Sequence, residues 1–563
     1  MTFFGKRRES GGSDVEKASA DPSEGQGRMD PKVLDPNSGE TEGLSQEQEE
    51  VLHRKLKGRH MQMIAIGGSI GTGLFVGSGS ALQSGGPASL VIDFIIIGIM
   101  LFFTVHALGE LAVMYPVAGA FYTYSCRFID PAWGYAMGMN YAFNWLVVLP
   151  LELTAAGITL QFWEGARDIN ISVWITVFLV IVTIINLFGV RGYGEVEYIL
   201  GILKIIAVVG FIITAIIINC GGVPTDNRGY IGGRYWHTPG AFRNGFKGFC
   251  SVFVTAGFAF AGTELVGLAA AEADNPRRSL PKATKQVFWR ISLFYIVSLT
   301  LVGLIVPSDD SRLLNASGGN TAASPFVIAF QLANIAVLPS IFNVVITLAV
   351  ISVANSCTYG STRTLHALAE RHMLPSWFGY VDSHGRPMFS LIVALLFGCL
   401  AFINEAAAGE EIFNWLLALS GLSQFFTWAS INLAHIRFRH AWKLQGNSLD
   451  EIPFRAAGGI IGSYMGFGLN CLVLIAQFYI AISPLGSPMS AKNFFQNYLA
   501  AFIILLFYLG YKFWKRDWSW YIKLEDIDLV TGRRELNLGE TLRKEREEMA
   551  GWPAWKKAWH WFC

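Results

Sequence analysis

Two glycine-rich stretches interrupt apolar segments of the chain. Residues 67–73 read GGSIGTG and residues 256–267 read AGFAFAGTELVG. Both stretches overlap a motif of Gly-Thr-x-Leu followed by Val-Gly, at residues 71–77 and 262–267. A glycine inside a helix costs about 0.5–1 kcal/mol relative to alanine, so this density predicts that each helix unwinds locally. In lipid, unwound backbone is tolerated only where it faces protein or a water-filled cavity. The pair therefore predicts a site built from two broken helices.

Broken helices offer complementary backbone groups to a small ligand. The N-terminus of a half-helix presents N–H groups that suit a carboxylate, and a C-terminus presents carbonyls that suit an ammonium. An α-amino acid carries both groups, and its carboxylate is expected near Ser69–Gly73. The alternative is close packing of helices through small residues. The residues predicted from this argument to bind substrate are Ile66, Ser69, Ile70, Gly71, Thr72, Gly73, Phe258, Ala259, Phe260, Ala261 and Thr263.

Three ionisable residues fall inside apolar segments, where charge is expensive and indicates function. Glu264 stands beside the second glycine-rich stretch, Glu152 near the middle of a long apolar segment, and Lys204 deep in another. We predict that one or more of them couples protons to transport. For Glu152 the alternative is a paired carboxylate that only fixes helix packing. For Lys204 it is a side chain that extends to the cytosolic interface.

Two further polar residues lie in the second predicted span. Glu110 is expected to pair with an arginine in a loop, and His106 is expected to be a packing histidine rather than a proton relay.

The composition excludes several classes of protein. Of the 563 residues, 52% are hydrophobic and 15% are charged, whereas soluble proteins carry about 25% charged residues. The net charge of +1 suggests no nucleic-acid partner. The seven scattered cysteines predict neither a disulfide scaffold nor a metal site, and no cofactor is expected. No motif of a membrane enzyme is present at a plausible place, so the chain is not expected to be an enzyme.

A template of about 20 apolar residues predicts an all-α polytopic membrane protein with twelve spans. Residues 1–57 are predicted to be a disordered cytosolic tail, 58–516 the twelve-helix domain, and 517–563 a second cytosolic tail. The Lys/Arg bias places both termini in the cytosol. Residues 119–130 are predicted to form an interfacial helix. The expected spans are 60–84, 88–115, 133–161, 170–190, 194–219, 247–272, 286–307, 325–355, 387–404, 410–436, 459–483 and 494–515, and the eighth is allowed to run on towards His366.

The sequence resembles the fungal amino-acid permeases, closest to their general amino-acid permease branch. The resemblance runs from about His60 to the C-terminus and is carried by residues 62–73 (QMIAIGGSIGTG), 107–112 (ALGELA), 145–152 (WLVVLPLE), 262–270 (GTELVGLAA), 275–283 (NPRRSLPKA) and 415–423 (WLLALSGLS). It implies broad-specificity proton–amino-acid symport at the plasma membrane. It also implies the amino acid–polyamine–organocation fold, a LeuT-like 5+5 inverted repeat with helices 1 and 6 broken and two additional C-terminal helices.

The resemblance also implies roles for particular residues. Lys204 matches a lysine that stands where sodium binds in sodium-dependent relatives, with Ser352, Asn355 and Ser356 as neighbours on the eighth span. Ser352 is also expected to bind substrate, and Asn355 to take part in proton coupling or selectivity. Phe258 matches an aromatic residue that closes over the substrate. In the tails, Cys563 matches a palmitoylation candidate, and Lys6 and Lys17 match lysines that ubiquitin-ligase machinery modifies.

Two other functions share much of this pattern. An ion channel would need a continuous pore with a filter-like repeat, and none is found. A nutrient sensor of the same fold would bind amino acids without accumulating them, and only a transport measurement separates it from a permease.

Overall fold

The computed structural model describes residues 56–67, 70–314, 324–405, 409–533, 547–548, 551–553 and 555–556. Within these ranges the chain is helical, and its only sheet-like contact is an isolated bridge between Leu56 and Ala273. The elements are α2 (Gly58–Gly67), η2 (Gly73–Gly77), α3 (Ser78–Met114), α4 (Ala120–Phe128), α5 (Pro131–Leu160), α6 (Glu164–Arg167), α7 (Ile171–Leu187), α8 (Gly189–Asn219), η3 (Trp236–Gly240), α9 (Gly245–Phe260), α10 (Leu265–Leu268), η4 (Ala269–Glu272), α11 (Pro276–Trp289), η5 (Arg290–Val297), α12 (Ser298–Ile305), α13 (Ser311–Leu314), α14 (Pro325–Leu332), α15 (Leu338–Glu370), η8 (Ser376–Gly379), α16 (Met388–Gly398), η9 (Cys399–Glu405), α17 (Gly409–Leu444), η10 (Leu449–Glu451), α18 (Gly459–Ile482) and α19 (Ala491–Lys515).

Both predicted helix breaks are present. Helix α2 ends at Gly67 and the helix resumes at Gly73, so the first span is interrupted within its glycine run. Helix α9 ends at Phe260 and α10 begins at Leu265, with Gly262 at φ 90° between them. A side chain is strained at that backbone angle, which explains why a glycine stands there. The predicted broken helices 1 and 6 are thus confirmed.

The predicted spans and the predicted interfacial helix need two corrections. The boundary predicted between the first two spans is present inside α3, because the non-helical Gly86 (φ 82°), followed by Pro87, interrupts the helix there. The segment 325–355 is two helices, α14 and α15, because the left-handed Asn334 (φ 52°) ends the first. The extension towards His366 is confirmed, since α15 continues to Glu370. The segment 120–128 is helical, but most of α4 is buried among other helices, so it is no surface helix.

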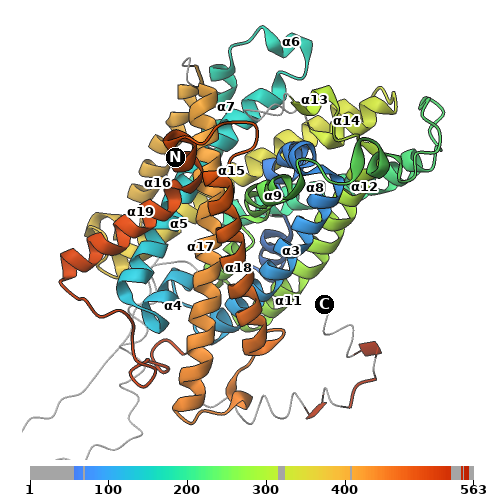
Figure 1. The fold of residues 1–563 in the computed structure, drawn as a ribbon. Coiled ribbons are helices and arrows are strands. Elements are labelled where there is room, and N and C mark those ends of the chain that lie inside the picture. Colours follow the sequence, from blue (N-terminus) through green and yellow to red (C-terminus); the bar gives the residue numbers. More distant parts are fainter. Residues whose placement is uncertain are drawn as a thin grey trace, which may run out of the picture. The chain divides into compact units, whose positions relative to one another are not determined.

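Eight helices in the described part of the chain are long and apolar enough to cross a membrane, and Ile171–Leu187 and Met388–Ile403 are shorter apolar helices. The count of twelve spans stays a prediction. Large apolar side chains are exposed along α7, α8, α18 and α19, among them Ile206 and Leu506. A surface of this kind suits lipid rather than water. Helices α6, α13 and α14 lie at one end of the bundle and α4 lies at the other (Figure 1).

The chain after α19 does not leave the bundle at once. The Ile522 N–H donates to the Ile129 carbonyl at 2.9 Å, and the Tyr115 hydroxyl donates to the Leu529 carbonyl at 2.9 Å. Ile527 and Leu529 are buried. Helix α19 ends at Lys515, and residues 517–533 then pack against the end of the bundle that carries α4.

Gly73 is where the two broken helices touch. A methyl group on Gly73 would overlap the Ala259 Cα and lie 2.8 Å from the Ala259 nitrogen. We expect Gly73→Ala to lower the thermal unfolding midpoint of the purified protein, because overpacking against rigid backbone costs about 1–3 kcal/mol. Gly210→Ala on α8, where nothing lies within 4 Å, is the matched control. It should leave the midpoint unchanged or raise it. Equal midpoints for both variants would contradict the close contact.

Candidate functional site

A cavity lies where the two broken helices face α5 and α15. It encloses about 300 Å³, its open mouth included. Its walls come from the first break, the sixth break, α5 and α15, and are formed by Gly71, Thr72, Gly73, Asn144, Trp145, Val148, Glu152, Phe258, Ala261 and Val353. Backbone from both breaks thus lines one small space, together with a carboxylate, an amide and aromatic rings.

Helix α5 supplies the polar side chains of the cavity. Asn144, Val148 and Glu152 recur at intervals of four residues, so they share one face of the helix. The Thr72 hydroxyl donates to Glu152 Oε1, which ties α5 to the first break. Glu152 Oε2 and both polar atoms of the Asn144 amide are buried without a partner among the described residues. Such groups are costly unless a ligand or water satisfies them.

The helix that leaves the first break starts without a side-chain cap. Thr72 is its N-cap residue, and its side chain makes no capping hydrogen bond, while the Phe75 N–H donates to the Gly71 carbonyl at 3.1 Å. The Thr72 hydroxyl, which could have capped the helix, is directed to Glu152 instead. The first N–H groups of a helix have no intrahelical partner, so they suit an anionic group of a ligand.

A second polar cluster surrounds Lys204 on α8. Lys204 Nζ donates to Ser352 Oγ at 2.7 Å, and Ser352 Oγ donates to Glu197 Oε2 at 2.7 Å. The Asn355 amide donates to Glu197 Oε1 at 3.3 Å. The charges of Glu197 and Glu152 both act on Lys204, which is 1% exposed. Lys204 therefore does not extend to an interface; it is the cation of a buried network between α8 and α15.

Glu264 forms a third cluster, outside the cavity wall. It accepts from the Tyr141 hydroxyl at 3.1 Å, from Trp428 Nε1 at 3.1 Å and from the Gly262 N–H at 3.2 Å. Three donors from α5, α17 and the break itself hold this carboxylate in place. Its contacts fix the loop between α9 and α10.

The next residue, Thr263, connects the same loop to the seventh span. Its hydroxyl donates to the Phe260 carbonyl at 2.7 Å and accepts from the buried Arg290 guanidinium. Phe260 stacks on Tyr295 with ring centroids 4.1 Å apart, and the Tyr295 hydroxyl donates to the Ala259 carbonyl at 2.7 Å. The end of α9 is thus anchored on η5, and the Ala259 carbonyl already has a donor.

Several predicted substrate residues do not line the cavity. Ile70 is buried, the Ala259 carbonyl and the Phe260 ring contact Tyr295 of η5, Thr263 faces Arg290, and Ser352 belongs to the Lys204 cluster. The structure gives no side chain for Ile66. The remaining predicted residues lie outside the described ranges, and these are Ser69, Lys6, Lys17 and Cys563.

The sequence analysis missed Asn144, Trp145, Val148, Val353 and Glu197. For Asn144 and Val148 the signal was their spacing from Glu152 on one helix face. Glu197 stands seven residues before Lys204, two helical turns away on the same face. Trp428 and Arg290 gave no signal, because their proximity to Glu264 and Thr263 arises only from tertiary packing.

Glu110 and His106 were predicted with partial success. Glu110 Oε1 lies 2.6 Å from Arg439 Nε and 3.1 Å from His435 Nε2, both on helix α17. The arginine is therefore helical and not in a loop, because α17 extends to Leu444. His106 Nδ1 lies 2.8 Å from the Phe102 carbonyl, and its ring packs on Phe102 and Phe454, as expected of a packing histidine.

The half-helices α2 and α10–η4 are joined at the ends remote from the cavity. The Leu56 N–H donates to the Glu272 carbonyl at 3.0 Å. The Glu272 carboxylate accepts from the Tyr359 hydroxyl at 2.6 Å and from Arg363 Nε at 3.2 Å. These contacts tie the segment before α2 to α15 through Glu272 and close this side of the site.

Comparison with known proteins places the chain among transporters. The family model "Amino acid permease" matches residues 60–522. An amino-acid permease of Schizosaccharomyces pombe is 60% identical over 485 residues, which are 86% of this chain and 82% of that protein. Cationic amino acid transporter 1 of the same organism is 56% identical, with coverages of 88% and 84%. General amino-acid permease GAP2 of Candida albicans is 53% identical, with coverages of 94% and 90%.

Among solved structures, a manganese transporter of Eremococcus coleocola aligns with a TM-score of 0.53 at 13% identity. The alignment covers 86% of this chain and 97% of that one. It establishes the fold, which is that of the LeuT-like transporters, as the two broken helices predict.

The Lys204 cluster provides a test of buried charge. We expect Lys204→Met to lower the unfolding midpoint strongly, because Glu197 would be left buried without its cation, a change that costs about 3–5 kcal/mol. The double variant Lys204→Met/Glu197→Gln should recover much of that loss, as measured by thermal unfolding of the purified protein. The exposed Lys443→Met is the control for the substitution itself. A double variant no more stable than Lys204→Met alone would contradict the network.

Proposed function

The chain belongs to the amino acid permease family, and from this premise we propose that it is a broad-specificity plasma-membrane permease that symports amino acids with protons by alternating access. The observation that carries the proposal is the cavity between the two helix breaks, where an uncapped helix start faces Glu152 and Asn144. Relatives that share more than half of its residues are named as amino-acid transporters or permeases, which are not enzymes.

The proposed pose follows from the charges of the cavity wall. The substrate carboxylate accepts from the N–H groups around Gly71–Gly73, where the helix dipole is positive. The substrate ammonium lies towards the end of α9 at Phe258 and Ala261 and towards Glu152. The side chain then faces Trp145, Val148 and Val353, which form an apolar wall. Because the charged anchors recognise only groups that all α-amino acids share, this arrangement favours broad specificity.

Of the three candidates for proton coupling, we assign the proton to Glu152. It is the only one of the three that lines the cavity, and it is bonded to Thr72 in the first break. Its protonation therefore changes both the charge next to the substrate and the contact between α5 and the moving half-helix. Lys204, Ser352 and Asn355 form a fixed cation site that replaces bound sodium, and Glu264 holds the loop of the sixth break.

Alternating access requires contacts that can open on one side of the cavity. The bonds of Glu272 with Leu56, Tyr359 and Arg363 close one side in this structure. We propose that they separate when the site opens to the cytosol, with both termini on that side. In the tails, Lys6 and Lys17 are proposed ubiquitin acceptors and Cys563 a proposed palmitoylation site, on the resemblance to the family alone.

A preference for cationic amino acids is the second candidate. A carboxylate in the cavity wall attracts a cationic side chain, and one of the similar relatives is named a cationic amino acid transporter. In that case Glu152 selects the substrate and does not carry the proton.

Competition for uptake tests the proposed function. In cells that lack their own amino-acid permeases, each of the twenty amino acids is tested as a competitor against one labelled neutral amino acid, at two pH values. We expect competition by neutral, basic and acidic amino acids, with saturable uptake that accumulates the label. Much stronger competition by Lys and Arg than by the neutral and acidic amino acids would support the cationic preference. Binding without accumulation would contradict transport and indicate a sensor.

Proton coupling is tested through pH-dependent uptake. Symport of one proton at about 100 mV supplies about 2.3 kcal/mol, enough for about 50-fold accumulation. We expect uptake to rise as external pH falls, and Glu152→Gln to lose both the pH dependence and the accumulation while it still exchanges substrate. Glu264→Gln keeps the shape of a side chain that lies outside the cavity. This variant should keep the pH dependence of uptake, with a lower rate of uptake. Normal pH dependence in Glu152→Gln would remove Glu152 from the coupling.

A further inference from the structure

A second cavity shares no lining residue with the first and lies between α3, α11 and the segment that connects η10 to α18. It encloses about 610 Å³, its open mouth included. Its walls combine three aromatic rings, an imidazole and two cations, and are formed by Phe102, His106, Lys285, Phe288, Phe454, Arg455 and Ala457. The chemistry of this cavity differs from that of the first.

The cavity has a rigid frame. Phe102 contacts Phe288 across the α3–α11 interface with ring centroids 6.1 Å apart, and Phe454 stacks on His106 at 6.2 Å. The segment that connects η10 to α18 is fixed to α3, because the Ala456 N–H donates to Glu110 Oε2 at 2.6 Å. Arg455, the next residue back, is thereby held at the cavity mouth.

The mouth of the cavity continues into a surface that faces lipid. On α11 and η5, Trp289 and Leu293 are exposed at intervals of four residues from Lys285. On α3, Ile99 and Ile92 are exposed seven and fourteen residues before His106. The two helices pack together, since Gly98 lies against Ile291. Exposed apolar side chains therefore continue along both helices from the cavity that holds the two cations.

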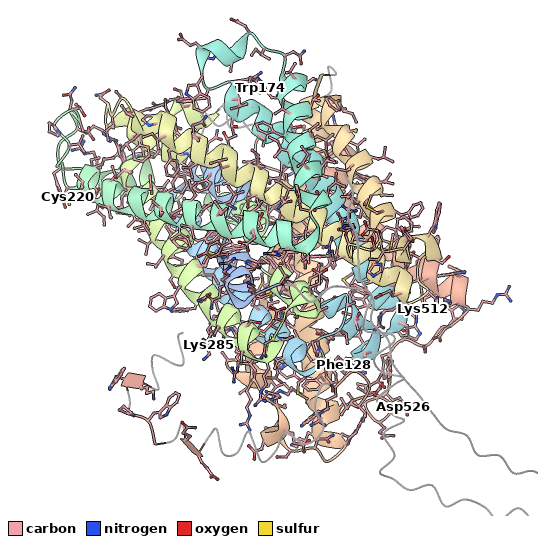
Figure 2. All side chains as sticks on the ribbon, turned by 180° about the vertical axis from the view of Figure 1, so that it is seen from behind. Phe128, Trp174, Cys220, Lys285, Lys512 and Asp526 are labelled. Atoms are coloured by element: carbon pink, nitrogen blue, oxygen red, sulfur yellow. The ribbon has the colours of Figure 1, made fainter. Side chains whose placement is uncertain are left out.

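The cations lie at one end of the bundle. Lys285 is at the same end as Phe128 and Asp526, and opposite Trp174 (Figure 2). Charge bias predicts that this end is cytosolic, where anionic lipids concentrate. Arg455 shares its charge with Asp450 at 2.6 Å, and Lys285 lies close enough to His106 for their charges to interact.

We propose that this cavity binds an anionic phospholipid. Its phosphate group lies between Lys285 and Arg455, its glycerol backbone packs against the aromatic rings, and its acyl chains lie against the exposed apolar side chains of α3 and α11–η5. A soluble phosphate would use the cations but leave the aromatic wall of the cavity unexplained. A protein partner would have to enter through the bilayer face. Because α11 follows directly on the half-helix η4, a lipid at this place stabilises the seventh span against α3.

The test uses the full-length protein in nanodiscs of phosphatidylcholine, alone or with phosphatidylserine. We expect phosphatidylserine to raise the thermal unfolding midpoint and to remain bound in native mass spectra. In Lys285→Gln and Arg455→Gln the affinity should fall about fivefold each, since a basic residue near an anionic surface contributes about 1 kcal/mol. Lys282→Gln, an exposed lysine one turn away on α11, is the matched control and should behave as the wild type.

Two further experiments test the proposal. One tests the direction of the charge effect, and the other distinguishes a lipid phosphate from free inorganic phosphate. Asp450→Asn removes the carboxylate that competes for Arg455, so it should strengthen retention of phosphatidylserine. Inorganic phosphate added to phosphatidylcholine discs should not raise the midpoint. Stabilisation by inorganic phosphate equal to that by phosphatidylserine would overturn the lipid site, as would equal retention of phosphatidylserine by the wild type and the Lys285→Gln/Arg455→Gln double variant.

Discussion

The approach of Gly73 to the backbone of Ala259 is the contact on which the candidate site depends. It brings the start of one half-helix against the end of another, at a separation that no side chain allows. Only there can backbone groups from both breaks reach one small ligand. The cost of unwinding two helices inside a membrane is offset because the polar groups of each break are bonded to neighbouring helices, as Thr72 is to Glu152 and Thr263 is to Arg290.

The buried charged residues around this contact differ in their hydrogen bonds. Glu264 is satisfied by donors from three sides, which makes it a fixed part of the frame. Ser352 links Lys204 to Glu197, so these two charged groups form one buried network between α8 and α15. Glu152 has one bonded oxygen and one oxygen without a described partner. The difference in hydrogen bonding, rather than in residue type, separates the carboxylate suited to change its charge from those that hold the structure.

The end of the bundle that carries α4 is held by several polar anchors. Glu110 connects α3 with α17 and with the segment around Ala456, and Lys512 pairs with Asp130 at 3.0 Å. Residues after α19 return to this surface through Ile522 and Leu529. The contacts of Glu272, in comparison, connect the segment before α2 with η4 and α15.

The sequence by itself determined the fold class, the place of both helix breaks and the identity of Glu152, Lys204 and Glu264 as unusual residues. Those features are local: glycine density, apolar length and charge in an apolar segment each act on a few neighbouring residues. The tertiary structure decided which of them meet. The break at Asn334, which separates α14 from α15, was not among the predicted boundaries. Asn144 reaches the cavity wall, whereas Phe260 and Thr263 face η5, because helix packing fixes which side of each segment is turned inward. The sequence shows that a residue is polar or is a glycine. Which residue it contacts depends on the packing of segments that are far apart in the chain.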